Sequence, residues 1–390
     1  MDHFPIDVDE LADFALRLVR EPSPSGSEGQ VAKIVADEMG RLGLRVQIDD
    51  MGNVVGTLDA GPGPRVLLDS HMDTVGVTDP ESWTHDPSGQ IASGRLYGRG
   101  AMDMKGPLAA AVHGIAALRG HLGRGSVMVT ATIAEEMVEG AALGYVARQH
   151  LPDFVIICEA TGLKLATGQR GRAEIIVEVR GASTHSSRPE LGVNAVQAMV
   201  DVIEALRETP VRKDEELGAG ILVLTDISSR PFPALSVVPN QCIATFDRRT
   251  LPGESAESIL LEIEEVVTRA LEGTGASGEV SIAEDCFKSY AGFEVRAANF
   301  APAWKSQADS VIVRGSSAGL SSAGIEPFTT HYAFCTNGSA TAGLMGIPTV
   351  GFGPGDESIA HRADEYVDLA DLVSAARGYA GIAHRLTNSA

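Results

Sequence analysis

The stretch VLLDSHMD, residues 66–73, decides how the rest of the chain is interpreted. A short apolar run of this kind is typical of a buried strand, and this one leads directly into a histidine and an aspartate. The stretches SVMVTATIAEE (126–136) and FVIICE (154–159) have the same form and end in glutamates. In open α/β sheets, ligands bind beyond the carboxyl ends of the strands. We therefore expect one crevice to be lined by His71, Asp73, Glu135, Glu136 and Glu159.

Helical and strand-like stretches alternate around these strands. Apolar residues recur at helical spacing in residues 8–20, 27–43 and 107–118, and either Ser25 or Ser27 would cap the second of these helices. Such alternation is typical of an α/β domain, and we expect a mixed, largely parallel sheet with helices on both faces.

The pattern changes near residue 171. Amphipathic helices are expected at 194–207 and 255–271, among strands at 173–179, 220–228, 241–247 and 280–282. The α/β pattern returns from about residue 290. We therefore expect a discontinuous domain, residues 1–170 and 290–390, interrupted by a smaller α+β domain of two helices and about four strands at residues 171–289.

Composition and charge exclude several classes of protein. The 390 residues are 44% hydrophobic and 21% charged, as in an ordinary globular protein. A net charge of −21 repels phosphate backbones and anionic lipids, so we expect neither nucleic-acid nor membrane binding. The four cysteines show no C-x-x-C spacing, the first residues do not resemble a secretory signal, and no apolar run is long enough to span a bilayer. We expect a cytoplasmic protein.

Two further polar residues accompany glycine-rich segments: Asp103 lies within GRGAMDMKG (98–106), and His361 follows GFGPGD (351–356). Carboxylates crowded into one crevice repel each other unless cations neutralise them. A mixed set of carboxylates and imidazoles suits Zn²⁺, Co²⁺ or Mn²⁺ better than Mg²⁺ or Ca²⁺. The set is too large for one tetrahedral zinc, which indicates two ions about 3.5–4 Å apart with a bridging carboxylate. Taken singly, His-x-Asp and Glu-Glu are common solvated pairs, so this hypothesis depends on the strand-end pattern.

These motifs, in this order and spacing, resemble those of the dinuclear-zinc exopeptidases and deacylases. That family includes acetylornithine deacetylase, succinyl-diaminopimelate desuccinylase and glutamate carboxypeptidase. The resemblance covers nearly the whole chain. It implies that the inserted domain is a lid and that two chains form a homodimer through this domain. It implies that one zinc is bound by His71 and Glu159 and the other by Glu136 and His361. Asp103 would bridge the two ions.

The resemblance also implies roles for residues that do not bind metal. Asp73 would orient the His71 ring. Glu135 would be the general base that takes a proton from the metal-bridging water. His185, in the inserted domain, would reach the active site of the partner subunit, and the peptide bond after Asp103 would be cis.

Substrate contacts are implied in the same way. Arg249 matches the family arginine that binds the substrate carboxylate, although the neighbouring Arg248 is an alternative. Where the family often has an asparagine this chain has Ser236, and Asn240 lies four residues later. The loop that contains Asn337 and Gly338 differs from the Gly-Gly-Thr-Asp-like sequence of many relatives, and we expect it to face the substrate.

The sequence therefore predicts a metal-dependent hydrolase that cleaves an amide bond in a small N-acylated amino acid bearing a carboxylate. Glutamate at position 159, where carboxypeptidase-like relatives often have aspartate, mildly favours a deacylase. A dipeptidase or carboxypeptidase with the same two ions is the alternative. A non-catalytic relative that keeps the fold for binding is a third possibility.

Overall fold

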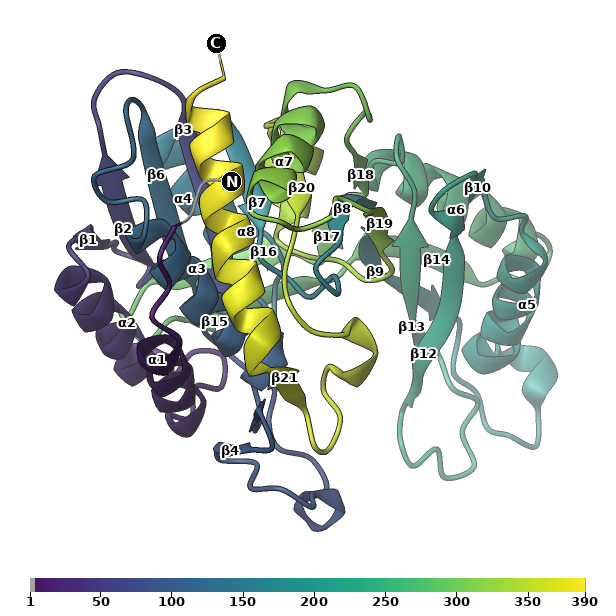
Figure 1. The fold of residues 1–390 in the computed structure, drawn as a ribbon. Helices are drawn as coiled ribbons and strands as arrows, with labels where there is room; N and C mark the ends of the chain where they lie inside the picture. Colours follow the sequence, from purple (N-terminus) through teal and green to yellow (C-terminus); the bar gives the residue numbers. More distant parts are fainter. Residues whose placement is uncertain (1–3, 390) are drawn as a thin grey trace. The chain divides into compact units, whose positions relative to one another are not determined.

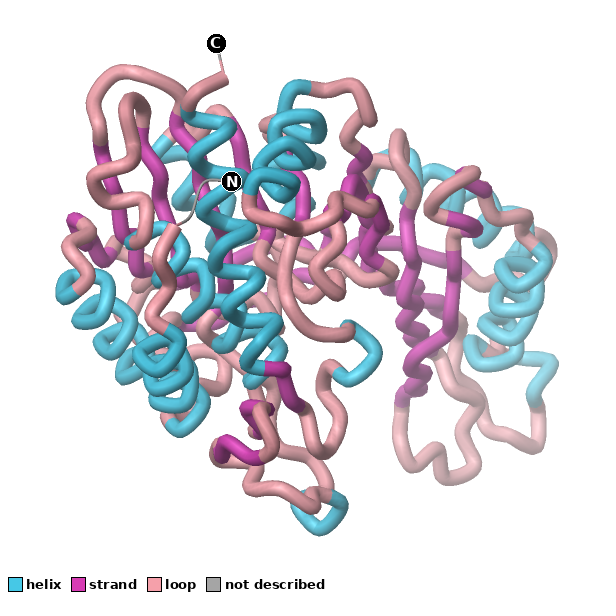
Figure 2. Tube along the Cα trace, in the orientation of Figure 1, coloured by secondary structure: helices cyan, strands magenta, loops and turns pink. Residues whose placement is uncertain are grey.

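The computed structural model describes residues 4–389, which form two compact units (Figures 1 and 2). The first unit comprises the chain up to Gln169, Cys286–Arg296 and the chain from Trp304 onward. The second comprises Arg170–Asp285 and Ala297–Ala303. The expected fold class is confirmed: a mixed α/β sheet with a parallel centre is accompanied by a separate antiparallel sheet with two helices.

The main sheet of the first unit has nine strands in the order β1-β2-β6-β3-β7-β20-β8-β18, with β19 paired to β8. The central strands β6, β3, β7 and β20 are parallel, whereas β1 and β2 join the edge in antiparallel orientation. The strands are β1 (Arg45–Ile48), β2 (Val54–Asp59), β3 (Arg65–His71), β6 (Ser126–Thr132), β7 (Phe154–Ile157), β8 (Leu165–Gln169), β18 (Trp304–Lys305), β19 (Thr329–Tyr332) and β20 (Thr349–Gly351).

Helices cover both faces of this sheet, as expected. Leu68 points to one face and packs in the large core formed with α1, α2, α3, α7 and α8, whereas its neighbour Leu67 points to the other and packs against Leu143 and Val146 of α4. This alternation explains why β3 is apolar at every position of its centre. The helices are α1 (Val8–Arg20), α2 (Gly29–Arg41), α3 (Gly106–Ala116), α4 (Ala141–His150), α7 (Val311–Ser322) and α8 (Leu369–Thr387).

The last helix, α8, lies across the face of the sheet that also carries α3 (Figure 1). The two helices approach closely at Gly114, where a Cβ atom would lie 2.3 Å from the carbonyl oxygen of Ala376. No other residue type fits this spacing without a shift of one helix. None of the described helices is long and apolar enough to cross a membrane.

Two smaller sheets lie outside the main sheet of the first unit. A three-stranded sheet contains β4 (Gln90–Ala92), β5 (Arg95–Tyr97) and β21 (Tyr366–Asp368), so it joins two parts of the chain that are far apart in sequence. The strands β15 (Glu284–Lys288) and β16 (Glu294–Ala298) form a two-stranded sheet where the chain passes from one unit to the other.

The second unit is an antiparallel sheet in the order β12-β13-β9-β14, with β17 also paired to β9. Alternate residues of β9 and β13 are buried against the two helices, and the residues between them form a half-exposed, mostly polar face. The pairing of β17 explains why residues 297–303 return to this unit. Its elements are β9 (Gly171–Arg180), α5 (Ala195–Glu208), β10 (Lys213–Asp214), β11 (Gly218–Ala219), β12 (Ile221–Arg230), β13 (Gln241–Thr250), α6 (Ala256–Leu271), β14 (Ser277–Ile282) and β17 (Phe300–Ala301).

Candidate metal centre

Six acidic and histidine side chains from separate parts of the first unit converge. His71 is the last residue of β3, Glu135 and Glu136 follow β6, and Glu159 follows β7. Because β3, β6 and β7 are parallel neighbours, their carboxyl ends lie at one edge of the sheet. Two loops add the remaining side chains: Asp103 lies in the irregular turn Ala101–Lys105 before α3, and His361 lies in the loop between β20 and β21.

Asp103 stands between the two imidazoles. Its Oδ1 atom lies 3.1 Å from Nε2 of His71, and its Oδ2 atom lies 3.2 Å from Nε2 of His361. Each imidazole has a glutamate of its own: His71 Nε2 is 3.4 Å from Glu159 Oε1, and His361 Nε2 is 3.1 Å from Glu136 Oε2. The ligand atoms of His71, Asp103 and Glu136 all lie within 4.8 Å of one another. The arrangement thus has two halves that share one carboxylate.

The electrostatics of the cluster fit a pair of divalent cations. Burial raises the pKa of Glu159 to about 7 and that of Glu135 well above its usual range, and neighbouring carboxylates add to both shifts. Hydrogen bonds to Asp103 and Glu136 raise the pKa of His361 to about 10. The six side chains comprise four carboxyl groups and two imidazoles, so the acids outnumber the bases even when both imidazoles are protonated. Nitrogen and oxygen donors in this mixture suit zinc, cobalt or manganese.

Asp73 is fully buried and holds several parts of the cluster at once. Its carboxylate accepts hydrogen bonds from the backbone N–H groups of Glu135 (3.1 Å) and Glu136 (3.2 Å), and Oδ1 lies 3.3 Å from Nδ1 of His71. The Ser25 hydroxyl donates to the same carboxylate at 2.6 Å. Asp73 thereby holds the His71 ring and the backbone of both glutamates in place.

Ser25 and Glu28 are contributors that the sequence pattern did not reveal. The expected capping of α2 by Ser25 or Ser27 is wrong, because α2 begins at Gly29 and the Ser25 hydroxyl bonds Asp73 instead. Glu28 is fully buried, and its Oε1 accepts from the N–H of Ala134, which has a left-handed φ of 51°. Glu28 therefore holds the residue before Glu135 in a conformation that non-glycine residues rarely adopt.

The expected peptide geometry after Asp103 is present, since the Asp103–Met104 bond is cis. The expectation that Asn337 contacts substrate is not supported by its surroundings. Its side chain is buried, donates to Asp69 Oδ2 at 2.9 Å and accepts from the N–H of Gly140 at 2.6 Å. Its amide is thus used inside the protein. Gly338 is packed so closely on Trp304 that a Cβ atom would lie 2.8 Å from the indole nitrogen, and it has no side chain to offer a ligand.

The remaining expected substrate contacts belong to the second unit. Arg248 is buried and pairs with Glu254 (2.6 Å) and Glu262 (3.1 Å) on the helix-covered face. Arg249 points to the half-exposed face, where its Nε atom lies 2.8 Å from Oδ1 of Asp247. The sequence offered both Arg248 and Arg249 as the residue that binds the substrate carboxylate. Of these two, only Arg249 has a guanidinium that a ligand can reach.

His185, Ser236 and Asn240 lie in exposed loops of the same unit. His185 pairs with Val237 through an isolated backbone bridge, and the carbonyl oxygen of Ser236 accepts from the N–H of Ser186 at 2.9 Å. The carbonyl oxygen of Asn240 accepts from Gly181. The side chains of His185, Ser236 and Asn240 are therefore carried by neighbouring, mutually bonded segments.

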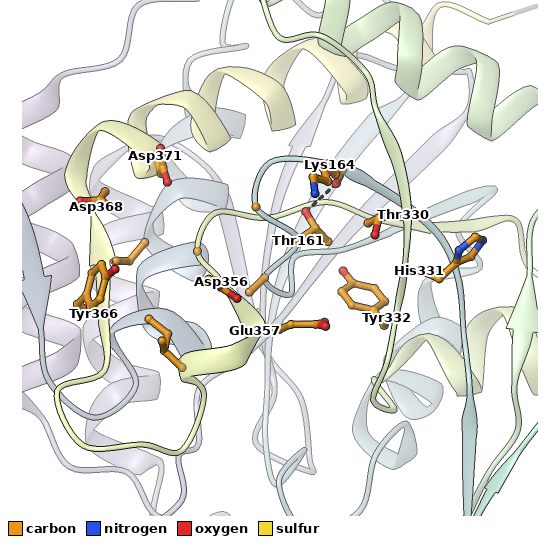
Figure 3. A pocket seen from close by; sticks show the side chains of 15 residues that line it. Thr161, Lys164, Thr330, His331, Tyr332, Asp356, Glu357, Tyr366, Asp368 and Asp371 are labelled. Carbon is orange, nitrogen blue, oxygen red and sulfur yellow. Dashed lines mark hydrogen bonds between the residues drawn. The ribbon is translucent and has the colours of Figure 1, made fainter. Parts of the chain in front are cut away.

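A cavity of about 400 Å³ adjoins the loops that carry two of the converging side chains (Figure 3). It is lined by residues that follow Glu159, such as Thr161 and Lys164, and by residues that precede His361, such as Asp356 and Glu357. None of the six converging side chains lines it. The cavity is large enough for a small molecule but lies outside the metal cluster.

Comparisons with known proteins agree with this geometry. A family model described as Peptidase family M20/M25/M40 matches residues 67–385. The chain is 35% identical to the uncharacterized protein YgeY of Escherichia coli (strain K12), over 96% of this chain and 93% of that protein. It is 28% identical to succinyl-diaminopimelate desuccinylase of Corynebacterium glutamicum, over 92% of each. Its fold resembles the crystal structure of aminopeptidase PepT from Bacillus cereus, with a TM-score of 0.77, 19% identity and coverage of 98% of this chain and 99% of that one.

We expect the metal-free protein to bind two divalent cations per chain, because each oxygen of Asp103 faces a different imidazole. His71→Ala and His361→Ala should each remove one ion, and Asp103→Asn should weaken both. Titration calorimetry with Zn²⁺ measures the stoichiometry. Binding should also raise the melting temperature, since a free cation concentration a hundred times Kd stabilises the protein by about 2.7 kcal/mol.

His150→Ala is the matched control, because this histidine lies at the end of α4 outside the cluster. It should leave two ions bound. A wild-type protein that binds no cation, or two histidine variants that each still bind two, would contradict the assignment.

Proposed function

Since the chain belongs to peptidase family M20/M25/M40, a family of metallohydrolases, we propose that it is a deacylase that hydrolyses an amide bond in a small N-acylated amino acid. The proposed cofactor is a pair of zinc ions, which cobalt or manganese can replace. His71 and Glu159 would hold one ion, Glu136 and His361 the other, and Asp103 both. Bound there, the two ions would polarise the scissile carbonyl and lower the pKa of the attacking water.

The observation that carries this proposal is the position of Glu135. Its carboxylate is buried within the cluster, with Oε2 3.9 Å from Nε2 of His71, yet it belongs to neither of the imidazole–glutamate pairs. A carboxylate that is near the reacting atoms but free of metal is suited to general-base catalysis. Glu135 would take a proton from the attacking water and later deliver it to the leaving amine. Asp73 would keep the Glu135 backbone in place throughout.

Deacylation is supported by Glu159 and by the desuccinylase relative. Removal of an acyl group and cleavage of a dipeptide both break an amide bond beside a carboxylate, so a dipeptidase or carboxypeptidase that uses the same residues is the second candidate. The likeness to an aminopeptidase structure concerns the fold alone. A non-catalytic role is disfavoured, because all five candidate ligands and Glu135 are present in one cluster.

Glu135→Ala should leave both cations bound and lower kcat by roughly 10²–10⁴-fold, the contribution typical of a general base. Hydrolysis of N-acetyl and N-succinyl amino acids and of dipeptides should be measured in parallel with metal content. The proposal predicts higher kcat/KM for the N-acyl compounds.

Preference for dipeptides would favour the second candidate. Turnover of the metal-loaded Glu135→Ala variant near the wild-type value would contradict the assigned base. A metal-loaded wild-type protein that cleaves no compound of either class would contradict hydrolysis of small amides altogether.

Arg249 is proposed to bind the substrate carboxylate, because its guanidinium lies on the open face of the second unit. Arg249→Met should raise KM for carboxylate-bearing substrates by roughly 10–100-fold, since a hydrogen bond between charged groups contributes about 1.5–3 kcal/mol. The same substitution should change KM little when the carboxylate is replaced by an amide.

Arg248→Met provides the comparison. It breaks a buried ion pair, so it should lower the stability of the protein without discriminating between carboxylate and amide substrates. Equal effects of Arg249→Met on both kinds of substrate would refute the proposed contact.

The protein is also proposed to be a homodimer in which His185 acts on the partner's substrate. The support is the strand β12, which lies at the edge of its sheet and exposes apolar side chains at Val223, Leu224 and Ile227. Exposed apolar edge strands are surfaces on which a second strand can pair. None of the four cysteines forms a disulfide with another described residue, which supports the proposed cytoplasmic location.

Analytical ultracentrifugation should show a dimer for the wild-type protein and a monomer for Ile227→Lys. Loss of the dimer in Ile227→Lys should also lower turnover, because His185 would no longer reach the active site of a partner subunit. Leu261→Lys, which changes an exposed residue on α6, should stay dimeric. A monomeric, fully active wild-type protein would overturn the proposal.

A further inference from the structure

Glu365 is a fully buried carboxylate four residues after His361, and its partners lie in the loop that carries Asp103. Its Oε1 atom accepts hydrogen bonds from the backbone N–H groups of Met102 (3.0 Å) and Asp103 (3.1 Å). Its carbonyl oxygen accepts from the N–H of Gly98 at 3.0 Å. Both ends of Glu365 therefore hold the segment that leads to Asp103.

The second carboxylate oxygen of Glu365 is paired with the Arg99 guanidinium. Arg99 is 6% exposed, and its Nε and Nη2 atoms find no acceptor among the described residues. Its guanidinium lies 5.5 Å from the centre of the Trp83 ring. Arg99 thus has Glu365 as its charge partner and neutralises a carboxylate that would otherwise be very costly to bury.

Strand pairing sets the distance between the two loops. β21 starts directly after Glu365, and its Tyr366 is paired with Tyr97 at the end of β5. Gly98 follows Tyr97, so the loop of Asp103 and the loop of His361 diverge from one point of the small sheet. The Glu365–Arg99 pair lies at this point.

A buried ion pair is seldom a good source of stability, since apolar residues of similar size often stabilise a protein as well or better. A geometric role explains its presence better. We propose that Glu365 is a positioning residue that holds the backbone of Asp103 in fixed relation to His361, so that the two oxygens of Asp103 can serve both cations. Arg99 has the supporting role of pairing with the second Glu365 oxygen, which leaves Oε1 aimed at the backbone. The inference rests on the proposed metal centre.

Two double variants separate positioning from stability. Arg99→Leu/Glu365→Leu replaces the ion pair with apolar side chains, which removes the backbone acceptor without leaving a charge unpaired. Arg99→Leu/Glu365→Gln also removes the charges but keeps an amide oxygen that can accept from Met102 and Asp103. We expect the first to lower Zn²⁺ affinity by about 10–100-fold and the second to restore most of it.

Zn²⁺ affinity is measured by competition with a fluorescent chelator, and stability by urea unfolding of the metal-free proteins. Amide hydrogen exchange of residues 100–105 in the metal-free state gives a readout that needs no cation. It should be at least tenfold faster in the Leu/Leu variant than in the wild type and should slow again in the Leu/Gln variant. Glu254→Leu breaks the buried Arg248–Glu254 pair of the second unit and is the matched control, which should lose stability but not Zn²⁺ affinity.

Wild-type Zn²⁺ affinity and slow exchange in the Leu/Leu variant would overturn the positioning role and leave the proposed function intact. Equal loss of affinity in the Leu/Leu and Leu/Gln variants would also overturn it, because the backbone acceptor would then be irrelevant. A wild-type protein that binds no Zn²⁺ would instead refute the metal centre itself and, with it, this inference.

Discussion

The constraint on which the structure depends is the crowding of carboxylates at the end of a parallel sheet. β3, β6 and β7 are so apolar that they can only lie in the centre of the sheet, and each delivers acidic or histidine side chains to the same edge. Glu135 and Glu159 are held there with little access to water, which is unfavourable for negative charge. Four carboxyl groups against two imidazoles fit the proposed pair of cations.

The same kind of hydrogen bond stabilises this unfavourable arrangement in three places. Asp73, Glu28 and Glu365 are buried acids, and each of them accepts hydrogen bonds from backbone N–H groups next to a converging side chain. Because these bonds hold the backbone, they occupy none of the carboxylate oxygens that face the two imidazoles. Backbone N–H groups held by buried side chains of this kind fix the geometry of the loops, which suits a site that must be formed before its ligand arrives.

Much of this was open to prediction from the sequence, because strand-end placement is a local pattern with a general geometric consequence. The fold class and the convergence of the strand-end residues followed from it, and Asp103 and His361 followed from the resemblance. The features that the sequence pattern did not predict depend on contacts between residues far apart in the sequence, or on the exact position of a residue within a strand. The buried role of Asn337 involves Asp69, 268 residues away in sequence. The difference between Arg248 and Arg249 is a matter of which face of β13 a residue occupies, and an error of one position reverses it. The two-residue strand β17 is too short to leave a periodic signal.

The position of α8 has a consequence for how the chain folds during its synthesis. This final helix packs against α3 in the middle of the first unit, with Gly114 and Ala376 in close approach. The chain through α8 therefore has to be synthesised before that hydrophobic interior can close. The second unit is built almost wholly from residues 170–285 and is under no such delay. During synthesis the second unit can therefore fold before the first, although most of the strands of the first unit precede it in the chain.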